Sequence, residues 1–127
     1  MSAIHWFEIP AADIQRAAQF YGQVLQAEIP LMDMTAQMGT WLGSLPARGG
    51  VGGALVQGEA VGYVPGQAGA LVYLVVDGTM EAALERVGTA GGQVLLPKTP
   101  LGEQAGGGFV AWIVDSEGNQ VGLYTKE

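Results

Sequence analysis

The stretch from residue 4 to residue 25, IHWFEIPAADIQRAAQFYGQVL, decides the fold, because it joins an extended segment to an amphipathic helix. Residues 4–9 are largely apolar and end at Pro10, which indicates a strand. Asp13 is a favourable N-cap for the helix that follows. The apolar side chains at the spacing of one buried helical stripe are Ile14, Ala17, Ala18, Tyr21, Val24 and Leu25. The sequence therefore predicts a strand followed by a helix.

Three short extended segments follow this helix. They span about 28–34, 38–45 and 51–57 and are separated by turn-prone glycine and proline. Residues 58–69, GEAVGYVPGQAG, contain four glycines and one proline, which predicts a linker.

The same order of elements begins again after the linker. Residues 70–77 form an apolar strand, and Thr79 can cap a second helix that ends at Gly91-Gly92. Further strands are predicted at 93–96, 107–114 and 119–125.

The two halves are predicted to be copies of one βαβββ module, because a shift of 66 residues places Asp13 on Thr79 and His5 on Leu71. We predict an α+β fold with one domain over 1–127, made of modules at about 4–57 and 70–125. Each sheet then carries a helix on one face, and the free faces can curve around a cleft. A sandwich without a useful cleft is the alternative, and the modules can pair within one chain or be swapped between chains.

Composition excludes several classes of function. Five basic and twelve acidic residues give a net charge of −7, which disfavours nucleic-acid and anionic membrane partners. The absence of cysteine excludes disulfides, thiolate nucleophiles and cysteine-ligated zinc. The first six residues lack the basic and apolar regions of a signal peptide, so we expect a cytoplasmic protein.

Two motifs resemble those of the vicinal oxygen chelate (VOC) superfamily, which includes glyoxalase I, bleomycin-resistance proteins and extradiol dioxygenases. Residues 11–21, AADIQRAAQFY, resemble its D-x-x-R-A-x-x-F-Y helix. Residues 115–124, DSEGNQVGLY, resemble its D-P-[DE]-G-N-x-[IVL]-x-L hairpin, with Ser116 where proline is usual. Together with His5 in the opening strand, these motifs extend the resemblance over essentially the whole chain. The resemblance implies curved mixed sheets around a cleft, and a homodimer, which the low charged fraction of 13% also favours.

The resemblance implies that an enzyme of this family holds a divalent metal with His and Glu side chains in the cleft. The four ligand positions fall on His5, near Leu55, on Leu71 and on Gly122. Only His5 is a metal-binding residue, so the ligand count does not support Zn, Ni, Mg, Mn or Fe, and we expect no cofactor. Gly122 also offers no general base for a glyoxalase-type proton transfer.

Without a metal, aromatic and polar side chains become the candidates for a ligand pocket, and no catalytic residue is assigned. Phe7 and Tyr73 are predicted on the same strand face at equivalent positions of the modules, where they form an aromatic wall or ordinary core. Trp41 and Trp112 are predicted to line the same cavity, and Gln57 and Tyr124 to supply hydrogen bonds. The full set of candidate ligand-binding residues is His5, Phe7, Trp41, Gln57, Tyr73, Trp112 and Tyr124.

Three functions stay open. The first is a metal-free binding protein of the bleomycin-resistance type, for which the acidic balance favours a cationic small molecule. The second is a divalent-metal-dependent glyoxalase-type lyase or isomerase with an atypical site. The third is an interaction module whose cleft is filled by its own side chains. The ligand count favours the first.

Overall fold

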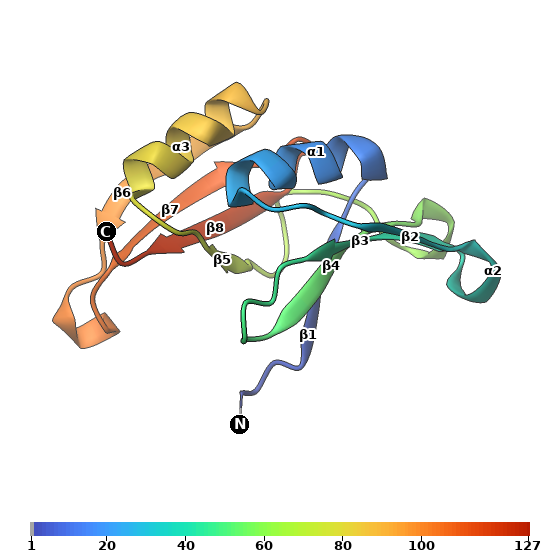
Figure 1. The fold of residues 1–127 in the computed structure, drawn as a ribbon, viewed down its shortest axis with the longest axis horizontal. Helices are drawn as coiled ribbons and strands as arrows, with labels where there is room; N and C mark the ends of the chain where they lie inside the picture. The colour runs from blue at the N-terminus through green and yellow to red at the C-terminus, as the bar shows by residue number, and fades with distance from the viewer. Residues whose placement is uncertain (1) are drawn as a thin grey trace.

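The computed structural model describes residues 2–127, so residue 1 of the predicted domain lies outside the described residues. It contains two four-stranded sheets, with the two long helices on the same side of them (Figure 1). The first module comprises β1 (Trp6–Pro10), α1 (Ile14–Leu25), β2 (Leu31–Met34), α2 (Thr35–Met38), β3 (Thr40–Leu45) and β4 (Gly52–Gln57). The second comprises β5 (Tyr73–Val75), α3 (Met80–Thr89), β6 (Gln93–Pro100), the short 3-10 helix η2 (Glu103–Ala105), β7 (Phe109–Val114) and β8 (Gln120–Thr125).

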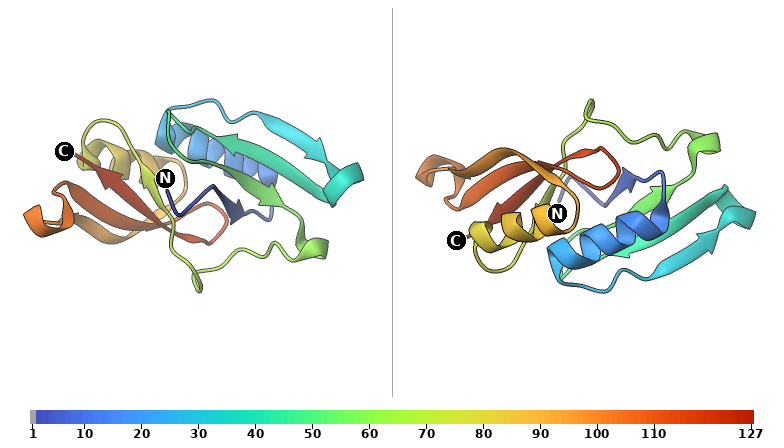
Figure 2. Two further views of the ribbon diagram at one scale, coloured as in Figure 1. Left: turned by 90° about the horizontal axis from the view of Figure 1, so that it is seen from below. Right: turned by 90° about the horizontal axis from the view of Figure 1, so that it is seen from above.

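The two sheets have the same topology, which confirms the predicted α+β fold with two βαβββ modules. Their strand orders are β1-β4-β3-β2 and β5-β8-β7-β6. In each sheet the first strand is parallel to the last, and the remaining neighbours are antiparallel. β1 and β5 are edge strands that lie toward the middle of the molecule (Figure 2).

The ends of α1 are fixed by polar contacts. The side chain of Asp13 accepts hydrogen bonds from the amides of Gln15 and Arg16, which confirms the predicted N-cap. At the other end Arg48 and Arg86 donate to the carbonyls of Leu25 and Val24 at 2.7 and 3.2 Å. Two cations at a helix C-terminus also interact favourably with its dipole.

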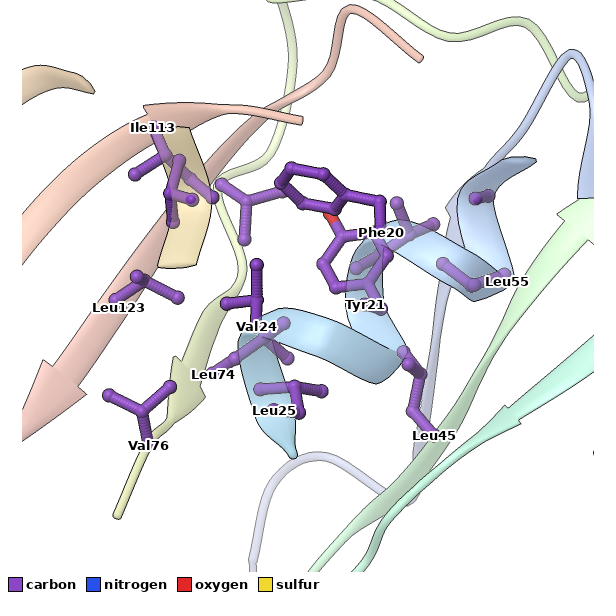
Figure 3. Packing of buried hydrophobic residues seen from close by; sticks show 14 of the residues in the cluster. Phe20, Tyr21, Val24, Leu25, Leu45, Leu55, Leu74, Val76, Ile113 and Leu123 are labelled. Atoms are coloured by element: carbon purple, nitrogen blue, oxygen red, sulfur yellow. The ribbon is translucent and has the colours of Figure 1, made fainter. Parts of the chain in front are cut away.

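One hydrophobic core lies between the helices and both sheets (Figure 3). Phe20 and Tyr21 of α1 form an edge-to-face pair with ring centroids 4.9 Å apart. Leu55 of the first sheet and Ile113 and Leu123 of the second belong to the same buried cluster. The modules therefore share a core within this chain.

Several predicted boundaries were wrong. The opening strand begins at Trp6, so His5 precedes it. The predicted strand at 70–77 contracts to Tyr73–Val75, because only these residues of an edge strand pair with β8. The strand predicted at 93–96 continues to Pro100, because register shifts accommodate the prolines along the edge strand β6. The linker 58–69 contains the 3-10 helix η1 (Glu59–Val61).

Within residues 2–127, no helix is long and apolar enough to span a bilayer.

Candidate functional site

The closing motif of the chain binds the start of α1. Glu117 accepts hydrogen bonds from the amides of Ala12 and Asp13 at 2.9 and 2.8 Å. It also forms an ion pair with Arg16, with 2.6 Å between Oε2 and Nε, and its side chain is only 1% exposed. Burial opposes its ionisation, but hydrogen bonds from Arg16 and the Asp13 amide outweigh burial and hold the pKa of Glu117 below its usual value.

Asp115 extends this contact into the core. Its carboxylate accepts from the hydroxyl of Tyr21 at 2.6 Å and from the side-chain amide of Asn119 at 3.0 Å. Burial, together with the charge of Asp115, raises the pKa of Tyr21 well above its usual value. Asn119 also donates to the carbonyl of Pro10 at 2.7 Å. The two motifs that carry the family resemblance thus bind each other across the module boundary.

A groove of about 710 Å³ lies between the modules, within the size range of small-molecule sites. Phe7 and Leu45 line it from the first module, and Leu71 and Val75 line it from the second. Its lining also includes one ion pair across the module boundary, formed by Arg48 and Asp77 at 3.3 Å.

The prediction that Phe7 and Tyr73 share a strand face was wrong. Phe7 packs against the core on the same strand face as buried Ile9, whereas Tyr73 alternates with buried Leu74 and faces away from the helices. Phe7 and Tyr73 each pair with a glycine of the last strand of their module, Gly53 and Gly122, and each ring covers that glycine, but on opposite faces of the sheets. The 66-residue offset of the helices therefore does not hold in the first strands, where a one-residue change of register reverses the face. Both Phe7 and Tyr73 nevertheless line the groove.

The Tyr73 ring covers the backbone of Gly122. A Cβ atom at position 122 would lie 2.6 Å from Cε2 and 2.7 Å from Cγ of that ring. The indole Nε1 of Trp112 donates to the Tyr73 hydroxyl oxygen at 2.7 Å, which fixes the ring in place. The position where the resemblance implies a glutamate ligand is therefore filled by an aromatic ring.

The other implied ligand positions do not assemble a metal site either. His5 is exposed and precedes β1, and Leu55 is fully buried in the core. Leu71 lines the groove with an apolar side chain. Across the described residues, no three His, Cys, Asp or Glu side chains are grouped so that they could hold a metal ion. The residues present do not fit the divalent metal that the family resemblance implies.

The remaining candidate residues lie apart from the groove. Trp41 and Gln57 line a separate cavity of about 410 Å³ on the first module, so the prediction that Trp41 and Trp112 share a cavity was wrong. Trp112 belongs to β7 of the other sheet, and the two sheets are not joined. The Gln57 side chain accepts from the amide of Ile14 at 2.7 Å and so helps to begin α1. Tyr124 pairs with Val75 in the second sheet.

Sequence reasoning missed Trp6 and its partners. The Trp6 ring lies over Gly52, where an added Cβ would come within 3.2 Å of Cζ3. Its indole Nε1 donates to Glu8 at 3.3 Å, and Tyr63 of the linker donates to the same carboxylate at 2.6 Å. The hydrogen bond to Glu8 raises the pKa of Tyr63. Trp6 follows directly after His5, but nothing in the sequence shows that it pairs with a glycine 46 residues later.

Comparison with known proteins gives the family. A solved member of the glyoxalase/bleomycin resistance protein/dioxygenase superfamily from Sphaerobacter thermophilus has a TM-score of 0.70 and 20% identity, over 98% of each chain. A glyoxalase/bleomycin resistance protein from Albidiferax ferrireducens has a TM-score of 0.69 and 14% identity, over 98% of this chain and 99% of that one. A glyoxalase I mutant from Zea mays has a TM-score of 0.69 and 14% identity, over 98% of this chain and 45% of that one.

At these identities the similarity shows the fold alone, and a search of curated proteins finds no match. The model of the Glyoxalase/Bleomycin resistance protein/Dioxygenase superfamily, however, matches residues 3–123. Because this match spans nearly the whole chain and agrees with the two motifs and the fold, the protein belongs to that superfamily.

Proposed function

We propose that the protein binds a small molecule in the groove between its modules and works without a catalytic metal, in the manner of a bleomycin-resistance protein. The observation that carries this proposal is the Tyr73 ring over Gly122. A side chain long enough to bind a metal from position 122 requires Tyr73 to leave its place and to lose its hydrogen bond with Trp112.

The groove supports binding of a largely apolar molecule. Its walls are mainly aliphatic and aromatic, and its volume of about 710 Å³ is at odds with a cleft filled by its own side chains. Arg48 and Asp77 neutralise each other there, so the lining itself carries no net charge from this pair.

The first arm of the test is elemental analysis of the untagged protein, purified without chelator. We expect much less than one divalent ion per chain, because His5 is the chain's only histidine and is exposed. One tightly held ion per chain that is lost in His5→Gln would overturn the proposal and favour a glyoxalase-type lyase or isomerase.

The second arm blocks the groove. Val75 is 60% exposed and lines the groove, so Val75→Trp should fill part of it and weaken binding of 8-anilinonaphthalene-1-sulfonate at least fivefold. Val94→Trp is the matched control, because Val94 is 42% exposed on β6 and does not line the groove. If the two variants bind 8-anilinonaphthalene-1-sulfonate with equal affinity in fluorescence titrations, the groove is not the binding site.

We also propose that the protein is a cytoplasmic homodimer. Large apolar side chains are exposed on strands of both sheets, which is typical of a surface covered by a partner. The most exposed of those on strands, apart from the residues at the groove and Trp6, are Met32, Leu95, Val94 and Leu31. Sedimentation equilibrium at tens of micromolar should give about twice the chain mass of 13.1 kDa, and a monomer at that concentration would exclude the dimer.

A further inference from the structure

We propose that the rings of Trp6 and Tyr73 are stacking platforms for a planar organic cation. This inference rests on the proposed function and specifies the class of its ligand: Tyr73 lines the groove, and Trp6 lies on the other central edge strand, outside the groove lining. It comes from a feature found in both modules, an exposed aromatic ring laid over a glycine of the neighbouring strand.

The Tyr73 platform is held on both sides. Underneath, Gly122 has no side chain, and its backbone is close enough that even a methyl group there would overlap the ring. At the edge, tryptophan is a hydrogen-bond donor only, so the indole of Trp112 must donate to the tyrosine oxygen. Tyr73 as a whole residue is still 43% exposed. A fixed ring with a free face can bind a flat ligand with little loss of side-chain entropy.

The first module has a looser platform, because a Cβ at Gly52 would lie 3.2 Å from the Trp6 ring and would not overlap it as at Gly122. The Trp6 ring lies over Gly52, and its indole nitrogen is bound to Glu8 two residues along the same strand face. Trp6 is 48% exposed. Trp6 and Tyr73 lie on β1 and β5, the edge strands toward the middle of the molecule, and both side chains are on the sheet face opposite the core.

Charge selects a cation. The Glu8 carboxylate lies at the edge of the Trp6 ring, and within residues 2–127 its hydrogen-bond donors are the neutral groups of Trp6 and Tyr63. The cationic residue of the groove lining, Arg48, is already bound to Asp77 and to the carbonyl of Leu25. Aromatic faces attract cations through their quadrupole, and the chain as a whole carries a charge of −7.

The test uses three acridines of similar shape at pH 7.5, namely cationic 9-aminoacridine, neutral acridine and anionic acridine-9-carboxylate. Fluorescence titration should show the cation binding at least tenfold more tightly than acridine, and the anion more weakly than both. Tyr73→Leu and Trp6→Leu should each weaken cation binding at least fivefold. Leu95→Ala is the matched control for loss of an exposed apolar side chain, since Leu95 is 45% exposed on β6, and it should leave binding unchanged.

Three further variants test the platforms, and two of them separate the Glu8 carboxylate from general surface charge. Glu8→Gln should weaken the cation severalfold and leave acridine unchanged, whereas Glu28→Gln, at an exposed site in the loop before β2, should change neither. Gly122→Ala should weaken binding by displacing the Tyr73 ring without removing it. Thermal melting of each variant shows whether it is folded.

The possible outcomes separate this inference from the proposed function. If all three acridines bind equally and Val75→Trp weakens their binding at least fivefold, the groove binds ligands but the cation-stacking inference is wrong. If the cation binds but Leu95→Ala weakens it as much as Tyr73→Leu, the platforms are also refuted. If none of the acridines and no anilinonaphthalene sulfonate binds, both proposals fail.

Discussion

Glu117→Gln should destabilise the protein although it removes no atom from the core. The carboxylate receives two backbone amides and a bidentate Arg16 guanidinium, with Arg16 Nη2 at 3.0 Å from Oε1. A glutamine can keep one oxygen for the amides of Ala12 and Asp13, but its own NH₂ group must then face the Nε–H donor of Arg16. Hydrogen bonds to a charged group contribute about 1.5–3 kcal/mol each. Arg16 is 53% exposed and can turn to water, so we expect a loss of about 2–3 kcal/mol.

The assay is urea unfolding at pH 7, monitored by fluorescence. An unchanged slope of the free energy of unfolding against urea concentration checks that unfolding stays two-state. Glu85→Gln is the control, because Glu85 is exposed on α3 and a substitution there should change the free energy of unfolding by less than about 0.5 kcal/mol. A loss in Glu117→Gln no larger than that of the control would refute the idea that this carboxylate joins the modules.

The same contact predicts a pH dependence. The pKa of Glu117 is lower in the folded protein than its usual value of about 4.3. A depressed pKa contributes stability that is fully present above the unfolded pKa and is lost as pH falls through the folded pKa. The difference between the wild-type protein and Glu117→Gln should therefore be constant near neutrality and shrink below about pH 4. A difference that stays constant down to pH 3 would contradict this reasoning.

The shorter predictions concern Gly88, His5 and Gly122. Gly88→Ala should stabilise the protein by roughly 0.5–1 kcal/mol in urea unfolding, because an added Cβ in α3 meets nothing within 4 Å. His5→Gln should leave the melting temperature and the metal content unchanged, because the side chain is exposed. Gly122→Glu combined with Tyr73→His places a carboxylate and an imidazole at paired positions on one sheet face, and calorimetry should show tighter Zn²⁺ binding than by the wild type. Gly122→Glu alone should lower the melting temperature, because Tyr73 must move.

The sequence predicted the fold because its strongest patterns are local. The helix cap at Asp13, the buried stripe from Ile14 to Leu25 and the glycines of the linker each act over a few residues, and the structure has all three. The helices of the two modules match at an offset of 66 residues, from N-cap Asp13 to N-cap Thr79. In the first strands this offset fails, because Phe7 and Tyr73 lie on opposite faces, and in a period-two element a one-residue error reverses the face.

The site was harder to predict because it depends on pairing between distant residues. Tyr73 acquires its role from Gly122 and Trp112, which lie 49 and 39 residues away along the chain. Arg48 was not a candidate at all, although it forms an ion pair with Asp77 and binds the end of α1. No sequence motif marks such contacts. The only signal in the sequence was Gly122, at the position where the family resemblance implies a glutamate.

The two family-like motifs explain why the fold was so much easier to recognise than the function. Arg16 and Tyr21 of the helix motif bind Glu117 and Asp115 of the hairpin motif, so each motif is the other's binding partner. Their contacts lie on the helix side of the sheets, whereas Trp6 and Tyr73 lie on the opposite face. The residues that hold the modules together are thus physically separate from those that can meet a ligand. Because the first set can stay fixed while the second changes, the motifs specify how the chain folds and leave open what it binds.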